Sequence, residues 1–257
     1  MALAFDRLID RLLFRRALPR WRRLAESAQS ADLIMLRSLR TPARQLRREI
    51  DRLLHVADSR LTLPMLGSNA ISKPLMTDWA WRPEIWRGPI APIGIAAVAN
   101  RTMFGTGATV FHDCDRSELT IRQIRNTREA DLAPFGFRMD VFGFEGGFLS
   151  LVLDLPEDVI RGLTLRHIIR METTVETEKP LEMFARLNIK HGPNTEQLVR
   201  ELPLGSSDVA AEFDLAYTKM NEKRIERAWV DLIFERPEMN QITLRDVTFT
   251  RRPRSEI

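Results

Sequence analysis

The chain of 257 residues has little cysteine and no long apolar run. Its single cysteine, Cys114, cannot form an internal disulfide, which fits a reducing compartment. No stretch of eighteen apolar residues occurs, so no transmembrane helix is predicted. Charged residues such as Asp6, Arg7 and Asp10 interrupt the apolar residues at the N-terminus, and no secretory signal is expected. We predict a cytoplasmic protein, either free or peripheral at a membrane.

Motifs typical of enzymes and metal sites are also missing. The densest group of possible metal ligands is His112 to Asp115, but no second group stands at a matching spacing. We expect these residues to form a turn at the end of a strand, with Asp side chains accepting from backbone amides. Gly146-Gly147 lacks the spacing and the helix context of a phosphate loop. The sequence therefore predicts no metal, no cofactor and no catalytic residue.

Lysine is absent from the first sixty residues, which contain fourteen Arg and seven acidic residues for a net charge of +7. The remaining 197 residues have a net charge of −3. Apolar residues in the first part recur at three- and four-residue steps, which predicts a basic arm of two or three amphipathic helices over residues 1–60. Pro19 is expected to end or kink the first helix, and Thr41-Pro42 to begin a third. The Arg residues that we select for surface binding are Arg7, Arg11, Arg15, Arg16, Arg22 and Arg23.

Three partners are possible for this arm. Its apolar stripe can pack on protein, either the rest of the chain or another molecule, which is the usual fate of such helices. It can instead lie on an anionic membrane, for which Arg beside Phe5, Phe14 and Trp21 is suitable. Nucleic acid is the least expected partner, because no reader motif accompanies the Arg residues. Asp6 and Asp10 weaken both interpretations that invoke an anionic partner.

Residues 61–92 form a segment rich in proline and tryptophan that links the arm to the body. Proline favours an extended chain here, and exposed indoles are unfavourable in water. We therefore expect Trp79, Trp81 and Trp86 to dock on the body as anchors. The alternative is a stacking platform for sugar rings or bases, with Arg82 and Arg87 as polar contacts.

Residues 93–257 show repeated two-residue alternation, which indicates half-buried strands. We count nine or ten, without long helical crossovers between them, and predict a mainly β fold: an antiparallel two-sheet sandwich of jelly-roll type preceded by helices. Arg245-Asp246 interrupts the last alternation, as a β-bulge does. The predicted core comprises Phe137, Met139, Leu151, Leu153, Leu165, Ile169, Leu187, Phe213, Leu232 and Phe234.

The polar faces of these strands contain the candidate ligand site. Arg186 and Asn188 share one strand face, and the following HGPN turn brings His191 and Asn194 to the same end. Arg and Asn have the directional donors and acceptors that a hydroxyl-rich ligand requires, and an indole from the linker would add a stacking surface. On this hypothesis Arg186→Ala abolishes glycan binding; the alternative is that Asn188 and Asn194 only brace the turn. Neighbouring strands would extend the face through Arg138, Arg166, Arg170 and Lys190, unless that face is only solvated.

Four segments of the body resemble a known group of sequences: FHDC, RQIRN, RLNIKHGPN and FDLAYTKMNEKR. They are similar to an uncharacterised bacterial family of unknown function, which implies no activity. The C-terminal segment from Ala210 also resembles the last strands of jelly-roll carbohydrate-binding modules in its pattern. This second resemblance implies the geometry of a sandwich.

These observations favour a non-catalytic binding protein, whose sandwich recognises a glycan-like or other polar ligand and whose arm contacts a surface or a partner. A structural or adaptor protein that binds other proteins or self-assembles is the alternative. A saccharide-active enzyme ranks third, because no pair of carboxylates can be named for it.

The strand pattern is complete without the arm, so deletion of residues 1–40 should leave a folded sandwich. Urea denaturation of the truncated chain should remain a single cooperative transition. Loss of cooperativity would mean that the arm is part of the core.

Overall fold

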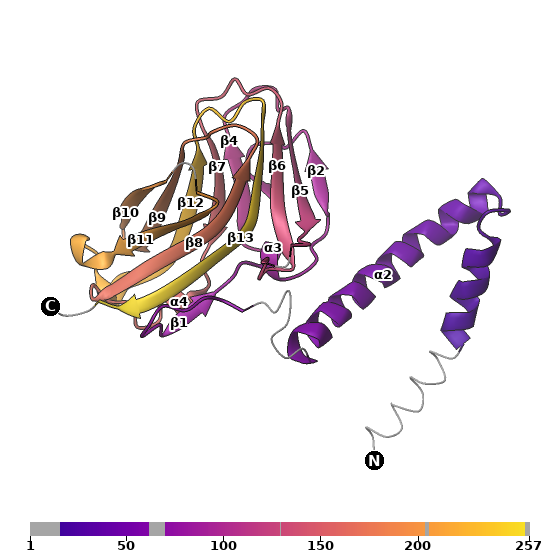
Figure 1. The fold of residues 1–257 in the computed structure, drawn as a ribbon, viewed down its shortest axis with the longest axis horizontal. Helices are drawn as coiled ribbons and strands as arrows, with labels where there is room; N and C mark the ends of the chain where they lie inside the picture. The colour runs from indigo at the N-terminus through magenta and orange to yellow at the C-terminus, as the bar shows by residue number, and fades with distance from the viewer. Residues whose placement is uncertain (1–15, 62–69, 129, 204–205, 255–257) are drawn as a thin grey trace, which may run out of the picture. The chain divides into compact units, whose positions relative to one another are not determined.

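The computed structural model describes residues 16–61, 70–128, 130–203 and 206–254. The chain divides into two compact units, residues 1–54 and residues 55–257. Figure 1 shows the elements of both units.

The first unit is helical. Residues 16–27 form one helix, and α2 (Leu33–Leu61) forms a second after a turn. The Asp32 side chain caps α2, because its Oδ1 accepts from the Met35 amide at 2.7 Å. The predicted break at Thr41-Pro42 is wrong, since Pro42 lies inside α2. The apolar stripe keeps its phase across this proline, so a single helix retains one continuous apolar face despite one missing hydrogen bond.

Two other features of this unit bear on the sequence predictions. Pro19 lies within the helical residues 16–27 and does not end them; in the described part of the arm, the helix is interrupted at residues 28–32. Across the described ranges, no helix is long and apolar enough to cross a membrane.

The second unit is a sandwich of two antiparallel sheets that lie face to face (Figure 1). The first sheet has the order β11-β8-β13-β6-β5-β2, and β1 also pairs with β13. The second has the order β10-β9-β12-β7-β4-β3. The mainly β, jelly-roll architecture predicted from the alternation is confirmed.

The strands of the first sheet are β1 (Trp79–Trp81), β2 (Gly94–Ala96), β5 (Leu119–Arg125), β6 (Phe135–Val141), β8 (His167–Thr177), β11 (Asp208–Asp214) and β13 (Asn240–Pro253). Those of the second are β3 (Thr102–Met103), β4 (Ala108–His112), β7 (Leu149–Asp154), β9 (Met183–His191), β10 (Asn194–Leu202) and β12 (Ile225–Phe234). Short helices α3 (Glu84–Arg87) and α4 (Glu157–Ile160) and the 3-10 turns η1 (Leu215–Tyr217) and η2 (Glu222–Arg224) complete the unit.

Four strands escaped the sequence analysis. β1, β2 and β3 are two or three residues long, too short for an alternation to be recognised. β10 is a sheet edge, and its residues do not alternate in polarity, because its less exposed face carries Glu196 and Arg200 as well as Leu198 and Leu202. It follows β9 directly through the predicted HGPN turn, where Gly192 has a φ of 58°.

The core between the sheets contains nine of the ten predicted residues, which are all buried. The exception is Leu165, which is only partly buried. It lies in a turn, because β8 begins at His167 and not at the Leu163 that the alternation indicated. The register of the strands is therefore as predicted, except before β8.

The predicted bulge is confirmed in β13, where the register against β8 shifts between Leu244 and Asp246. The carbonyl of Leu244 beside it accepts a hydrogen bond from Trp86 Nε1 at 2.8 Å. Trp86 is completely buried, so this bond fixes the segment around α3 to the bulge.

Two indoles of this segment allow a matched test of that bond. Trp86→Phe should lower the free energy of unfolding by about 1–3 kcal/mol, because it leaves the Leu244 carbonyl without its donor. Trp79→Phe should cost less, because the buried Nε1 of Trp79 has no hydrogen-bond partner. Urea denaturation of both variants checks this difference; equal losses would show that the bond contributes nothing beyond ring packing.

Candidate functional site

A pocket of about 270 Å³ lies on the outer face of the first sheet, over β8, β11 and β13. Ser72 and Leu132, from two loops outside these strands, line it as well. The polar side chains that line it are Ser72, Arg82, Arg170, Glu172, Thr173, Thr174, Asp208, Asp246 and Thr248. We call this the sheet pocket.

Strand alternation and the bulge place these side chains. Ile169 and Met171 of β8 are buried in the core, so Arg170 and Glu172 between them point outward. The extra residue at the bulge puts Asp246 opposite Thr174 on the same outer face. The pocket therefore gains a carboxylate that an unbroken register would have turned toward the core.

Arg82 and Asp246 form a bidentate ion pair in this pocket. Arg82 Nε donates to Asp246 Oδ1 at 2.8 Å, and its Nη2 donates to Oδ2 at 2.7 Å. The guanidinium is 1% exposed, and its Nη1 has no hydrogen-bond partner. Burial raises the pKa of Asp246 above its ordinary value, although the hydrogen bonds from Arg82 oppose this shift.

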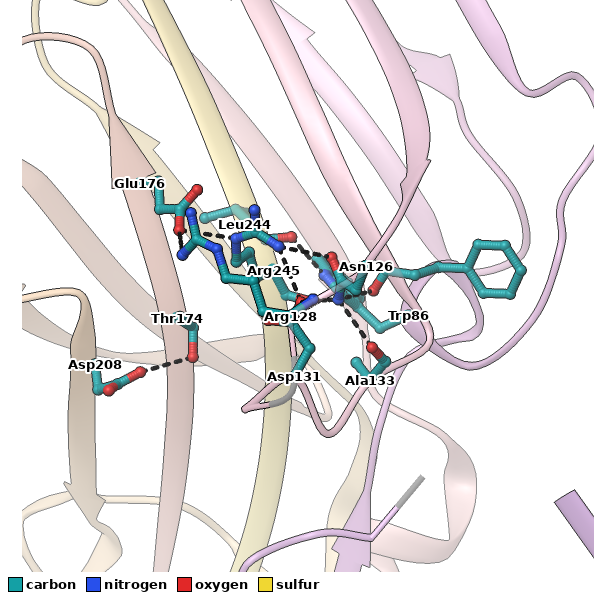
Figure 2. Close-up of polar contacts among 11 residues, drawn as sticks. Trp86, Asn126, Arg128, Asp131, Ala133, Thr174, Glu176, Asp208, Leu244 and Arg245 are labelled. Carbon is teal, nitrogen blue, oxygen red and sulfur yellow. Dashed lines mark hydrogen bonds and ion pairs between the residues drawn. The ribbon is translucent and has the colours of Figure 1, made fainter. Parts of the chain in front are cut away.

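A second polar cluster surrounds Arg245 at the bulge (Figure 2). Arg245 donates to Glu176 Oε1 at 2.8 Å and to Asp131 Oδ2 at 3.0 Å, and Arg128 also pairs with Glu176. Asn126 Nδ2 lies within hydrogen-bonding distance of three backbone carbonyls, including that of Arg245 at 2.8 Å. These bonds hold the loop between β5 and β6, which carries Leu132 to the pocket.

Arg170 and Glu172 of the pocket are also paired. Arg170 donates to Glu172 at 2.7 Å and to Glu212 at 2.9 Å, and Arg252 contacts Glu212 at 3.3 Å. Partial burial raises the pKa of Glu212, but hydrogen bonds from Arg170 and Arg252 outweigh it and lower the pKa overall. Thr174 donates to Asp208 at 2.8 Å. The pocket thus combines ionised groups of both signs with hydroxyls, and its carboxylates keep unused acceptor positions.

The structure separates the four residues predicted to form one binding edge. Arg186 and Asn188 lie on the outer face of β9, whereas His191 has the parity of the buried Leu187 and Ile189. Asn194 pairs with His191 and therefore points to the same side. His191 Nδ1 accepts from the Asn221 amide at 3.3 Å, which ties it to the end of the sandwich.

Arg186 and Asn188 are engaged in internal hydrogen bonds. Asp231 Oδ2 accepts from Arg186 Nε at 2.8 Å and from Asn188 Nδ2 at 3.1 Å. Asn188 Oδ1 accepts from Gln197 at 2.9 Å. Asp231 is 4% exposed, so this network compensates a buried charge. The ligand site predicted on this face remains a prediction, but Arg186 and Asn188 already form hydrogen bonds within the protein.

The linker residues lie with the other sheet. Trp79 and Trp81 belong to β1, beside β13, and both pack against the core. The Trp81 ring lies 5.8 Å from that of Phe249. With Trp86 and Arg82 buried as well, none of these four side chains shares a sheet with Arg186 and Asn188.

Sequence reasoning missed Trp229, which lies on the outer face of β12 opposite Asn188. The alternation could have revealed it, because Leu232 and Phe234 of the same strand belong to the predicted core and the odd-numbered positions must then face outward. The Arg227 guanidinium lies 4.4 Å from the centre of this indole and is bonded to Asp154 at 3.1 Å. The chain's own side chain therefore occupies one face of the ring.

The proposed extended basic face is not formed. Arg138 and Arg170 lie in the first sheet, whereas Arg186 and Lys190 lie in the second. Each has a carboxylate beside it, as in the pairs of Arg138 with Asp140 at 2.8 Å and Lys190 with Glu226 at 2.6 Å. Strand order, which the sequence does not show, separates these residues.

The Arg residues selected in the arm are only partly covered by the structure. Arg16, Arg22 and Arg23 are exposed on the helical residues 16–27, whereas Arg7, Arg11 and Arg15 lie outside the described residues. Within the described ranges, no group of three or more His, Cys, Asp and Glu side chains is arranged to hold a metal ion.

Comparison with known sequences identifies one family. The model of a family of unknown function, DUF6478, matches residues 1–257. No curated protein matches the chain.

Solved structures with a similar sandwich include carbohydrate-binding modules. The family 11 module from Clostridium thermocellum, in complex with a β-1,3-1,4-mixed-linked tetrasaccharide, is 10% identical over 60% of this chain and 94% of its own, with a TM-score of 0.38. The second family 22 xylan-binding domain of Xyn10C from Paenibacillus barcinonensis is 8% identical over 55% and 90%, with a TM-score of 0.35. The active domain of tailspike protein 4 from bacteriophage CBA120 is 7% identical over 56% of this chain, with a TM-score of 0.40, and the match spans only 19% of that domain.

The ion pair at the base of the sheet pocket makes a prediction about stability. Arg82→Leu should cost about 3–5 kcal/mol at pH 7, because it leaves the buried Asp246 without its counter-charge. An acid with a raised folded pKa binds its proton more tightly in the folded state, so its stabilising contribution falls as pH rises. The loss should therefore shrink when the pH is lowered toward about 4, as urea denaturation across this range can measure.

Two controls accompany this experiment. Arg87→Leu, at an exposed position five residues away, should change stability by about 0.5 kcal/mol or less. Replacing Arg82 and Asp246 together by Leu should recover most of the loss. A loss that does not depend on pH would contradict the assigned role of Asp246.

Proposed function

The chain belongs to this family of unknown function, and we propose that its sandwich is a non-catalytic binding domain for a neutral, hydroxyl-rich ligand such as a glycan. The observation that carries the proposal is the sheet pocket, in which ionised side chains of both signs and hydroxyls converge on one concave surface. Its volume of about 270 Å³ lies just below the range of roughly 300–1,000 Å³ that is usual for ligand sites. It suits a small ligand or a short part of a longer one.

Charge balance decides the class of ligand. The lining contains two guanidinium groups, of Arg82 and Arg170, and three carboxylates, of Glu172, Asp208 and Asp246. The guanidinium groups are bonded to carboxylates, so an anionic ligand would have to compete for them. Hydroxyl groups both donate and accept, and they can use the remaining lone pairs of the carboxylates without disturbing these ion pairs.

The sheet pocket is preferred to the face around Trp229 for a physical reason. An indole is a good stacking surface only while its ring face is free, and Arg227 covers one face of Trp229. Arg186 and Asn188 beside it are committed to Asp231. Solved modules that bind xylan or mixed-linked glucan have similar sandwiches, but the proposal rests on the pocket of this chain.

Filling the pocket tests this function without removing a polar group. Ala210 is exposed and lines the pocket, so Ala210→Leu should weaken glycan binding by about tenfold or more through steric exclusion. Ala216→Leu, at an exposed position outside the lining, should leave binding unchanged. Calorimetric titration of a glycan panel against both variants measures the difference, and thermal unfolding confirms that both are folded.

Arg186→Ala belongs in the same panel, because it distinguishes the two faces. Binding that survives Arg186→Ala and is lost in Ala210→Leu supports the sheet pocket. Binding that shows the opposite pattern would move the site to the face of β9 and β12. A wild-type chain that binds no glycan in the panel would remove this function.

We further propose that the arm binds an anionic partner. Along one face, α2 has exposed Arg residues, of which only Arg47 has a carboxylate partner among the described side chains, and its other face is an exposed apolar stripe. Retention of the full-length protein on immobilised poly-glutamate tests this statement. Arg44→Gln with Arg48→Gln should elute at lower salt than the wild type. Equal elution would contradict it.

A further inference from the structure

The apolar stripe of α2 is open along most of its described length. Its exposed members and their exposed fractions are Met35 (39%), Leu46 (41%), Ile50 (45%), Leu53 (68%) and Leu54 (51%). With the half-buried Leu36, Leu39 and Ala43, they recur at three- and four-residue steps and therefore lie on one helical face. Single exposed apolar residues are normal on a surface, but a continuous stripe of this kind marks an interaction site.

The opposite face of the helix is basic. Residues 33–54 contain six Arg and two acidic residues, for a net charge of +4. The acidic residues are Glu49 and Asp51, and Asp51 lies 3.5 Å from Arg47 in an exposed pair. The other Arg residues, Arg37, Arg40, Arg44, Arg48 and Arg52, are exposed.

We infer that α2 lies in the interface of an anionic lipid bilayer, with its apolar stripe in the boundary of the acyl chains and its Arg residues among the headgroups. This inference rests on the proposed function of the arm and names its partner. An interfacial helix needs an apolar face, a strongly basic polar face and low overall hydrophobicity, and α2 has all three. Anionic headgroups supply charge along the whole helix, as the spread of its Arg residues requires.

A second copy of the helix is the main competitor for the stripe. Leu36, Leu39, Ala43, Leu46, Ile50 and Leu53 have heptad spacing, as in a coiled coil. However, Arg40 and Arg47 flank this seam on one side. In a parallel pair, the residues of the second helix that face them are Met35 and Pro42, which flank the seam on its other side. Parallel pairing would give these Arg residues no acidic partner, and antiparallel pairing would bring Arg beside Arg. Charge complementarity therefore favours an anionic partner over a second copy.

Co-sedimentation of the full-length protein with vesicles tests the inference. We expect binding to vesicles of phosphatidylcholine with 30% phosphatidylserine and much weaker binding to phosphatidylcholine alone. Raising the salt from about 0.1 M to about 0.5 M should release the protein, because the Debye length shortens from roughly 10 Å to a few Å. Leu46→Gln with Leu53→Gln should lower the partition coefficient by about tenfold or more, because it removes two apolar anchors.

Thr41→Gln provides the matched control. It introduces the same side chain at an exposed position on the polar face, and vesicle binding should be unchanged. Circular dichroism of the full-length variants checks that helix content is retained. A loss of binding in Thr41→Gln equal to that in the stripe variant would overturn the assigned orientation of the helix.

The other outcomes separate this inference from the proposal on which it rests. Arg-dependent retention on poly-glutamate without vesicle binding would overturn the lipid partner and leave an anionic partner in place, for example an acidic protein. Absence of both would remove both statements. A lipid-free dimer that dissociates in the Leu46→Gln, Leu53→Gln variant, without vesicle binding, would assign the stripe to a second copy.

Discussion

Strand β13 changes one of its neighbours part of the way along its length, and the bulge at Arg245 is where the change occurs. Before the bulge it pairs with β6, and beyond it with β1, while β8 runs along its other edge. Three consecutive residues there hold three other parts of the chain. The carbonyl of Leu244 binds Trp86, the carbonyl of Arg245 binds Asn126, and the carboxylate of Asp246 binds Arg82.

The sheet pocket depends on these three attachments. Ser72 and Leu132 reach the outer face of the first sheet because the segments that carry them are fixed to the bulge through Arg82 and Asn126. Without the extra residue, Asp246 would face the core and its pairing with Arg82 would be lost. One inserted residue thus determines both the ion pair of the pocket and the position of its rim.

The charged side chains are arranged differently in the two units. On the outer sheet faces most Arg side chains have a carboxylate within bonding distance, and this pairing makes a desolvated surface tolerable. On the described side chains of α2, the excess of Arg has no such compensation, and the apolar stripe opposite remains exposed. Paired charges suit a neutral ligand, whereas unpaired charges beside an apolar stripe suit an anionic surface. The net charge of +4 of the whole chain is therefore the sum of two surfaces with different charge arrangements.

Local patterns in the sequence were sufficient to predict the N-terminal helices, the antiparallel sandwich, the bulge and nearly all of the core residues that we named. Each of these follows from side-chain periodicity, which depends on neighbours along the chain. Periodicity also placed Trp229 outward, although this consequence was overlooked. It fails for β10, where the charged Glu196 and Arg200 share the less exposed face with Leu198 and Leu202. The break predicted at Pro42 failed because the apolar stripe keeps its phase through the proline.

The candidate site was decided by tertiary structure. Arg82 and Asp246 are separated by 164 positions, and no local pattern reveals that they meet. The same holds for strand order, which placed Arg138 and Arg186 on different sheets, and for the side chains that use up Arg186 and Asn188 internally. Alternation determines which side of a strand a residue faces. Only the packing of strands and loops determines which residues share that side, which charges are already paired, and where a pocket remains open.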